Sequence, residues 1–477
     1  MTWQGYASKH LNIIMKTFQV EALRALYSKL DCIVIQATGA GKSACFNIPA
    51  IMLPPNKIGL VIVPTLALGE DHLRTLTILK IPSVFLQSTS RKEDFDDALE
   101  DTPRRTRVII AQPEMIFGTE VQKGILDRLI KNEAHLSFIA LDESHLIYEW
   151  ASFRSDFGEL RKLKDLFCCP IMALSATLKP ENLKSMKKDI LRNPVIIRGS
   201  IDRPNVAINF MPYRKGGSKE FPENATDPFY KTAIQIRNLV DGERTIVYCA
   251  YANECEKLQS SLRKLNVKCG AYWGKMRSNE KKEVFQDMRE GKIDILVATK
   301  AFGLGVNLQD IRHVIHVGLP ESLSSWMQEF GRAGRDGVEA HAHLLLCDHE
   351  DMSKLNYWMT NKKSEEHGKS IRQDFLVAWL YVSKAFTGDC LRLFQLTYFE
   401  EEQNVNPQLM PTACCSGCEV RASVPLKPAT ELNSVLQVFY VMQSKGLQWM
   451  YESQIIEWVQ GKGGQWVSFY FNSETME

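Results

Sequence analysis

One segment of the sequence, from Gln36 to Ser43, combines glycines, a lysine and a hydroxyl residue in an order that suits phosphate binding. Glycines let successive backbone N–H groups wrap around phosphate oxygens, and the N-terminus of a following helix adds a favourable dipole. Lys42 would reach the β- and γ-phosphates, and the Ser43 hydroxyl would bind Mg²⁺. The nucleotide-binding residues expected in this segment are Thr38, Gly39, Ala40, Gly41, Lys42 and Ser43.

Further along the chain, the apolar run Phe138–Leu141 ends in two carboxylates, Asp142 and Glu143. Asp142 would hold Mg²⁺ through a water molecule, and Glu143 would polarise an attacking water as a general base. A solvated acidic strand end is the alternative interpretation. The phosphate-binding segment upstream favours the hydrolysis of a nucleoside triphosphate.

These residues need a scaffold that brings strand ends together, and the apolar runs of the sequence predict one. Short runs without charged residues are typical of strands buried on both faces of a parallel sheet, and helical patterns between them indicate βαβ units. In the first 200 residues the runs are Cys32–Ile35, Gly59–Val63, Val108–Ile110, Phe138–Leu141 and Ile171–Leu174. A second set predicts a second α/β domain in tandem: Thr245–Tyr248, Ile293–Ala298, His313–Val317 and His343–Leu346. The stretch Met211–Pro228 is predicted to be a loop or linker.

The composition is that of an ordinary globular chain. The 477 residues are 45% apolar and 24% charged, with a formal net charge of +2. A nucleic-acid surface would therefore have to be a local concentration of Lys and Arg. No apolar run approaches the ~20 residues that span a bilayer, and Met1–Lys16 lacks the pattern of a secretory signal. Most of the 12 cysteines lie in apolar stretches and are expected to be reduced thiols inside a cell.

Several segments resemble the motifs of superfamily 2 helicases. Asp142 to His145 is similar to the Asp-Glu-x-His box, and Gln328 with Gly331–Gly337 is similar to motif VI. The resemblance places Arg332 and Arg335 across a cleft from ATP, where they would stabilise charge on the transferring phosphate. It also implies that Gln19 reads adenine and that Val63–Leu68 faces the nucleic-acid backbone. Ser175 and Thr177 would couple hydrolysis to nucleic-acid binding, and Thr299, in motif V, would act in nucleic-acid contact or coupling.

Within that superfamily the sequence most resembles the RecQ family of DNA helicases. Leu146–Arg154 is similar to the aromatic-rich loop of that family, in which Trp150, Phe153 and Arg154 would contact DNA by stacking and by phosphate binding. The loop is shorter than the usual family form between Trp150 and Phe153, and hydrophobic packing of Trp150 is the alternative. Asp202–Asn205 resembles the Arg-Pro-Asn signature between the two motor domains, and Ala301–Gly305 with Trp326 resembles further RecQ segments.

A cysteine group near the end of these matches resembles the zinc-binding region of RecQ enzymes. Thiolates suit zinc, and a structural zinc ion takes four tetrahedral ligands. The candidate ligands are Cys390, Cys414, Cys415 and Cys418. The family pattern ends in three spaced cysteines, whereas this chain has Thr412 or Arg421 where one would fall. A filled zinc site and a decayed site packed with ordinary thiols both stay open. Further on, Ile455–Lys462 resembles the start of a winged-helix domain, of which we expect at most half.

These observations predict an α/β protein with two tandem RecA-like, doubly wound parallel-sheet domains, a helical zinc-binding region and a partial winged-helix-like C-terminus. The expected boundaries are residues 1–200, 201–350, 351–425 and 426–477. The resemblance implies a helicase that uses ATP and Mg²⁺ to move 3′→5′ on single-stranded DNA and to unwind duplex or branched DNA in recombination and repair. It further implies an intracellular protein of the nucleus without membrane contact. An RNA-dependent ATPase or helicase and a non-catalytic nucleic-acid-binding remnant are the alternatives.

Overall fold

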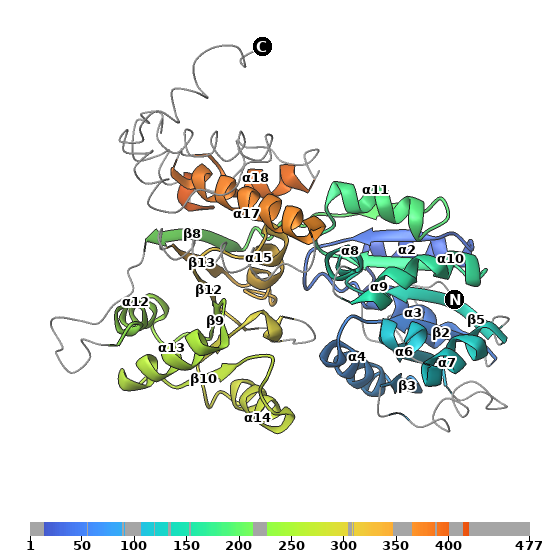
Figure 1. The fold of residues 1–477 in the computed structure, drawn as a ribbon, viewed down its shortest axis with the longest axis horizontal. Helices are drawn as coiled ribbons and strands as arrows, with labels where there is room; N and C mark the ends of the chain where they lie inside the picture. Colours follow the sequence, from blue (N-terminus) through green and yellow to red (C-terminus); the bar gives the residue numbers. More distant parts are fainter. Residues whose placement is uncertain are drawn as a thin grey trace, which may run out of the picture.

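The computed structural model contains two α/β domains and a smaller helical region (Figure 1). It describes residues 14–54, 56–87, 90, 106–118, 120–131, 135–151, 154–212, 227–303, 308, 310–346, 365–386, 389–399 and 414–418. Phe153 and the predicted partial winged helix at 426–477 lie outside the described residues. None of the helices that the structure describes is long and apolar enough to cross a membrane.

The first domain is built on a parallel sheet of seven strands in the order β3-β4-β2-β5-β6-β1-β7. Its strands are β1 Cys32–Ile35, β2 Ile58–Ile62, β3 Ser83–Leu86, β4 Val108–Ala111, β5 Leu136–Leu141, β6 Ile171–Ser175 and β7 Val195–Arg198. Its helices are α2 Thr17–Tyr27, α3 Ala44–Met52, α4 Leu66–Ile78, α6 Pro113–Phe117, α7 Glu120–Lys131, α8 Leu146–Trp150, α9 Ser155–Glu159, a 3₁₀ turn Leu160–Lys162, α10 Leu163–Leu166 and α11 Pro180–Asp189.

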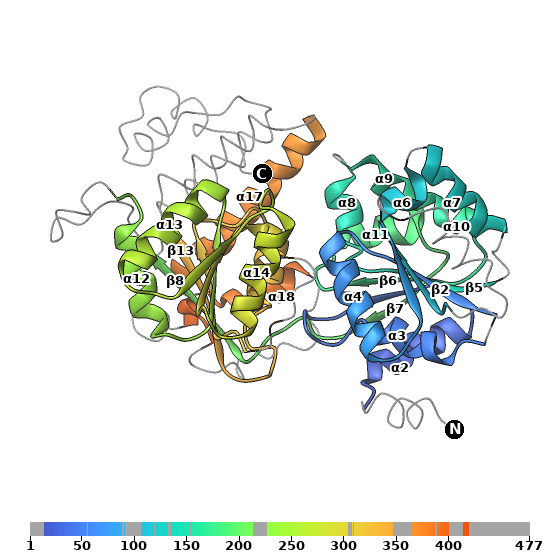
Figure 2. The same cartoon turned by 90° about the horizontal axis from the view of Figure 1, so that it is seen from below.

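Helices cover both faces of this sheet, which explains why its central strands are almost entirely apolar. In β1, Cys32 and Val34 pack into one hydrophobic cluster, and Ile33 and Ile35 pack into another on the opposite face. Figure 2 shows α2 and α3 on one side of the sheet and α7 and α9 on the other. Burial on both faces is what removes the alternation of polar and apolar residues from a strand.

The second domain repeats the plan with a parallel sheet of six strands in the order β10-β11-β9-β12-β13-β8. Its strands are β8 Val206–Pro212, β9 Thr245–Cys249, β10 Cys269–Tyr272, β11 Ile295–Ala298, β12 His313–Val317 and β13 Ala340–Leu346. Its helices are α12 Tyr230–Val240, α13 Ala252–Lys264, α14 Ser278–Arg289, a 3₁₀ turn Lys300–Phe302 and α15 Leu323–Phe330. The prediction of two tandem doubly wound domains is thereby confirmed.

The sequence prediction missed four strands, β3, β7, β8 and β10. All four are edge strands of their sheets, and two of them carry a polar or small residue in a short run, Ser83 in β3 and Gly270 in β10. The predicted linker Met211–Pro228 is wrong at its start, because β8 continues to Pro212 and pairs with β13. Residues 213–226 lie outside the described part of the chain.

The helical region consists of α17 Glu365–Phe386, α18 Leu391–Tyr398 and the cysteine turn Cys414–Cys418. Helix α17 contacts both α/β domains. Its Asp374 Oδ1 accepts a hydrogen bond of 2.5 Å from Lys179 Nζ in the first domain. Its Tyr381 hydroxyl accepts one of 3.2 Å from Trp326 Nε1 in the second. Figure 1 shows α17 running from above β8 towards α11.

Three histidines stack on one face of β12 and β13. The ring of His313 lies 5.2 Å from that of His341 and 5.3 Å from that of His343. His313 Nε2 lies 2.8 Å from Glu243 Oε2, and His313 Nδ1 lies 3.0 Å from His343 Nε2. Burial, and then the neighbouring imidazoles, lowers the pKa of His343 from 6.5 to about 3. The buried imidazole is therefore neutral in the folded protein at neutral pH.

This shift predicts that acid weakens the fold well before the carboxylates titrate. Below its ordinary pKa of 6.5 the imidazole of His343 gains a proton in the unfolded chain but not in the fold, until the pH approaches 3. We expect the free energy of unfolding to fall by about 2 kcal/mol between pH 6.5 and 5 through this residue. Urea unfolding at several pH values should show that His343→Leu flattens the slope by that amount. An unchanged slope in the variant would contradict the assignment.

Candidate nucleotide and nucleic-acid site

The phosphate-binding segment forms a closed turn between β1 and α3. Gly39 and Gly41 have φ values of +80° and +90°, a region that side chains disfavour. Lys42 is buried, and its ammonium donates hydrogen bonds to the carbonyl oxygens of Gln36 at 3.1 Å and Ala37 at 3.3 Å. Ser43 directly precedes α3. The turn thus holds its cation inside the loop, where a bound phosphate would replace the carbonyl contacts.

Gln19 of α2 is attached to this turn. Its Nε2 donates to the Gly41 carbonyl at 2.9 Å, and its Oε1 accepts from the backbone N–H of Lys16 at 2.8 Å. The ammonium of Lys16 donates to the Ala40 carbonyl at 3.0 Å. The first described helix is therefore fixed to the phosphate-binding turn through polar contacts as well as through its apolar face.

Asp142 and Glu143 lie at the carboxyl end of β5, beside the turn. Asp142 Oδ2 accepts a 2.7 Å hydrogen bond from His72 Nε2 of α4, and both side chains are buried. Burial opposes ionisation of Asp142, but the hydrogen bond and charge of His72, together with Lys42, hold its pKa below the usual range. Glu143 has a φ of +46°, which is strained for a residue with a side chain. Motif spacing gave no signal for His72.

A hydrogen-bond network joins the segment Asp142–His145, here called the acid box, to the second domain. Gln328 Nε2 donates to His145 Nε2 at 2.5 Å and to Thr177 Oγ1 at 2.8 Å. His145 Nδ1 then donates to Ser175 Oγ at 3.0 Å. Burial lowers the pKa of His145 to about 4, so the neutral ring can accept at one nitrogen and donate at the other. Residues predicted for motifs II, III and VI are therefore in direct contact.

Arg335 of motif VI and the backbone just before Arg332 lie against the phosphate-binding turn. A Cβ placed on Gly39 would lie 3.4 Å from Arg335 Cγ, and one placed on Gly331 would lie 3.2 Å from Thr38 Cβ. Arg332 is 6% exposed. Burial, followed by repulsion from Arg332 and Arg203, lowers the pKa of Arg335 to about 9. This is the concentration of positive charge that a triphosphate would neutralise.

Thr299 lies at the carboxyl end of β11, where its backbone N–H donates to the Tyr272 carbonyl at 3.0 Å. The backbone that follows it approaches the arginines. A Cβ placed on Gly303 would lie 3.9 Å from Arg332 Nη2. Only part of the motif V segment is described, since residues 304–307 fall outside.

The aromatic-rich segment packs inside the first domain. The Arg154 guanidinium lies 4.9 Å from the centre of the Trp150 ring and 4.5 Å from that of Phe157. It also bonds to the Glu114 carboxylate and, at 2.8 Å, to the Pro64 carbonyl of motif Ia. Trp150 thus contacts Phe157 and Arg154, and Arg154 ties this segment to motif Ia.

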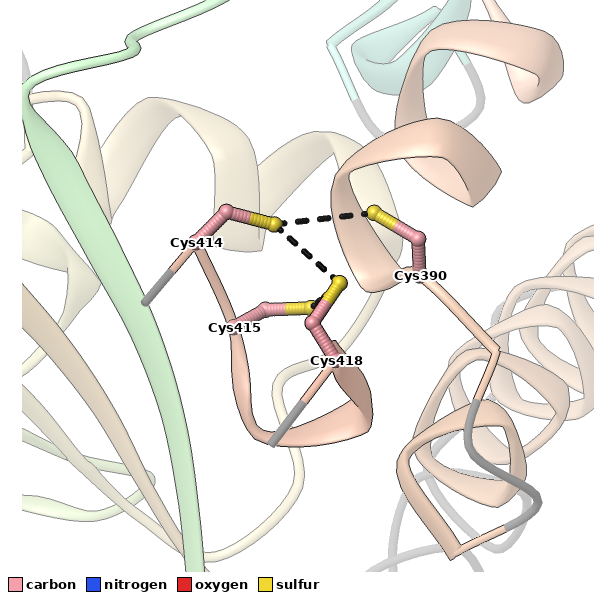
Figure 3. A group of neighbouring side chains, drawn as sticks. All are labelled: Cys390, Cys414, Cys415 and Cys418. Carbon is pink, nitrogen blue, oxygen red and sulfur yellow. Dashed lines mark hydrogen bonds between the residues drawn. The ribbon is translucent and has the colours of Figure 1, made fainter. Parts of the chain in front are cut away.

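Four cysteines converge beside α18 (Figure 3). The sulfurs of Cys390, Cys414, Cys415 and Cys418 all lie within 4.8 Å of one another. The adjacent Cys414 and Cys415 both belong to this group, because the cysteine turn Cys414–Cys418 brings both sulfurs close to those of Cys390 and Cys418. The backbone N–H of Leu391 lies 3.3 Å from Cys415 Sγ. Four thiols at such separations, with N–H groups aimed at sulfur, can hold one tetrahedral metal ion.

The fold and this site together define a class of protein with tandem RecA-like domains and, between them, residues that resemble the motifs of superfamily 2 helicases. Residues 16–186 match the DEAD/DEAH box helicase family, and residues 230–337 match the helicase conserved C-terminal domain. Over most of its length the chain is similar to members of the RecQ family of helicases.

Relatives in that family resemble most of this chain. It is 34% identical over 409 residues to the mouse bifunctional 3′-5′ exonuclease/ATP-dependent helicase WRN, covering 83% of this chain and 27% of the mouse protein. It is 31% identical over 425 residues to the ATP-dependent DNA helicase RecQ of Haemophilus influenzae, covering 86% and 61%. The chain thus spans less than two thirds of the length of these relatives.

Solved structures share the fold at lower identity. The DUF1998 helicase MrfA bound to DNA superposes with a TM-score of 0.58 at 20% identity, covering 72% of this chain and 50% of that one. Dbp5 of Saccharomyces cerevisiae, bound to RNA and ADP BeF3, superposes with a TM-score of 0.57 at 16% identity, covering 75% and 90%. These likenesses show the two-domain fold alone.

The cysteine turn generates a sharp steric prediction. A Cβ at Gly417 would lie 2.0 Å from the Asp389 carbonyl oxygen, so Gly417→Ala must displace the turn that carries Cys415 and Cys418. We expect a loss of about 1–3 kcal/mol in the free energy of unfolding and a lower metal content per chain. Gly158→Ala is the matched control, because nothing lies within 4 Å of its added Cβ. Equal stability of the two variants would refute this packing.

Proposed function

We propose that this chain is an ATP-dependent DNA helicase that moves 3′→5′ on single-stranded DNA. One observation carries the proposal. The segment Gly331–Gly337 of the second domain, here called the arginine loop, lies against the phosphate-binding turn of the first domain, so a nucleotide bound to the turn would contact both. The choice of DNA as the nucleic acid on which it moves is supported by relatives whose names describe ATP-dependent DNA helicases. Action on duplex and branched DNA in recombination and repair, and residence in the nucleus, belong to the same proposal.

In this proposal ATP lies between the two domains. Lys42 and the backbone of the turn bind its phosphates, Gln19 contacts adenine, and Arg332 and Arg335 stabilise the charge that develops during transfer. Glu143 orients and polarises the attacking water. Asp142 and Ser43 offer the hard oxygen donors that suit Mg²⁺, and the ionised state of Asp142 fits that role. Mg²⁺ would neutralise phosphate charge.

Coupling to DNA would run through the contacts that join the motifs. Gln328 bonds to both the acid box and Thr177, so closing or opening the cleft changes the surroundings of Ser175 and Thr177 directly. Trp150, Phe153, Arg154 and Thr299 are proposed to act at the DNA side. Arg154 does so in part by holding the aromatic segment to the motif Ia carbonyl.

We further propose that Cys390, Cys414, Cys415 and Cys418 bind a structural zinc ion. Soft thiolate ligands select zinc over magnesium or calcium, and a closed set of four leaves no position for substrate. We also propose the boundaries 1–200, 201–350, 351–425 and 426–477 for the four regions, with a segment similar to the start of a winged helix in the last.

Steady-state ATP hydrolysis without nucleic acid, with single-stranded DNA and with single-stranded RNA tests the proposed function. We expect strong stimulation by DNA in the wild type and a loss of about 10²–10⁴-fold in kcat for Glu143→Gln, because the variant removes the general base. Stimulation by RNA alone would move the protein to the RNA-dependent motors. No stimulated hydrolysis at all would favour a non-catalytic nucleic-acid-binding protein.

A further inference from the structure

Arg203, in the segment that connects the two sheets, holds the backbone of the arginine loop. Its Nη1 donates to the Gly331 carbonyl at 2.6 Å, and its Nη2 donates to the carbonyls of Ala333 at 2.6 Å and Gly334 at 2.9 Å. These three carbonyls flank Arg332 on both sides and precede Arg335. One rigid, planar guanidinium therefore fixes the path of the backbone from which both arginines project.

The same guanidinium touches the first domain. Arg203 Nη1 also donates to the Thr38 carbonyl of the phosphate-binding turn at 3.3 Å. The contacts to the arginine loop are shorter than this one, so the loop and Arg203 form the tighter unit. The contact to Thr38 is the weaker link between that unit and the turn.

Arg203 is itself held in place from the helical region. The buried Arg392 of α18 donates from Nη1 to Asp202 Oδ1 at 2.5 Å and to the Arg203 carbonyl at 2.8 Å, and from Nη2 to the Val206 carbonyl at 2.6 Å. Arg392 follows Cys390, whose side chain caps α18. The backbone of Arg203 is thus clamped on one side while its guanidinium clamps the arginine loop on the other.

We propose that Arg203 is a positioning residue for ATP hydrolysis, because it sets the distance of Arg332 and Arg335 from the phosphate-binding turn. Arg392 of the helical region anchors Arg203 in this position. The inference rests on the proposed ATPase function and adds a residue that does not itself touch the nucleotide. Catalysis is sensitive to such positioning, since a misplacement of about 1 Å costs on the order of 10²-fold in rate.

The test compares Arg203→Met, Arg335→Ala and the double variant in single-turnover ATP hydrolysis, which can follow slow reactions. Loss of an arginine that stabilises the transferring phosphate lowers kcat by roughly 10³–10⁵-fold. We expect Arg203→Met to lower kcat by about 10–100-fold with the KM for ATP within about threefold. If Arg203 acts through the arginine loop, adding Arg203→Met to Arg335→Ala should lower kcat by less than about threefold further. The two substitutions then remove parts of the same effect and are not independent.

Arg192→Met is the matched control. Arg192 also bonds to two backbone carbonyls and to an aspartate, but those are Phe167, Cys169 and Asp31 within the first domain. We expect that variant to lose stability without losing kcat. Should Arg203→Met fail to fold, Arg203→Lys, which keeps the charge with fewer donors, is expected to show the same pattern with a smaller loss.

The outcomes separate this inference from the proposed function. An active wild type with full kcat in Arg203→Met, or with additive losses in the double variant, would overturn the positioning role and leave the ATPase intact. A wild type that hydrolyses no ATP would overturn both. The role is supported if the Arg203 variants lose kcat while Arg192→Met does not, and if the double variant loses little more kcat than Arg335→Ala alone.

Discussion

A parallel sheet collects the carboxyl ends of its strands along one edge, and the functional site of this protein depends on that geometry. Asp142 follows β5, Ser175 ends β6 and the phosphate-binding turn follows β1, three neighbouring strands of the first sheet. Residues far apart in the sequence therefore meet without any long-range loop having to carry them. The arginine loop, which precedes β13 in the second domain, completes the site.

The cost of this arrangement is a high density of buried positive charge. Arg335, Arg332, Arg203 and Lys42 crowd the junction, and the pKa of Arg335 falls to about 9 because burial and its neighbours disfavour its charge. A polyanionic nucleotide would relieve that repulsion, so binding and closure of the two domains favour each other. The neutral ring of His145, bonded to Gln328, adds a contact across the junction that costs no further charge.

Local signals in the sequence predicted much of this molecule. The buried strands appear as uninterrupted apolar runs, and the phosphate-binding residues, acid box and arginines lie in short motifs whose positions the structure brings together. The sequence marked Arg203 only as part of a family signature and gave no sign of its bonds to the arginine loop. It gave no sign at all of His72 beside Asp142 or of Arg392 beside Arg203, because each acts through backbone carbonyls or a single carboxylate far away in the chain. Such partners are set by tertiary packing and leave no spacing to read. Sequence spacing also left the adjacent Cys414 and Cys415 ambiguous, whereas the turn directs both sulfurs to one point.

The position of the cysteine turn gives it a second consequence. Strand β8 is the outermost strand of the second sheet, and the turn pairs with its free side through Ile208 and Cys415, with further bonds from Ile208 to the Cys414 carbonyl and from Phe210 to Ser416. Unpaired edge strands recruit strands from other molecules and so promote aggregation. The cysteine turn occupies that edge and so protects solubility, because a chain that lost it would expose the free side of β8 to β-pairing with other molecules.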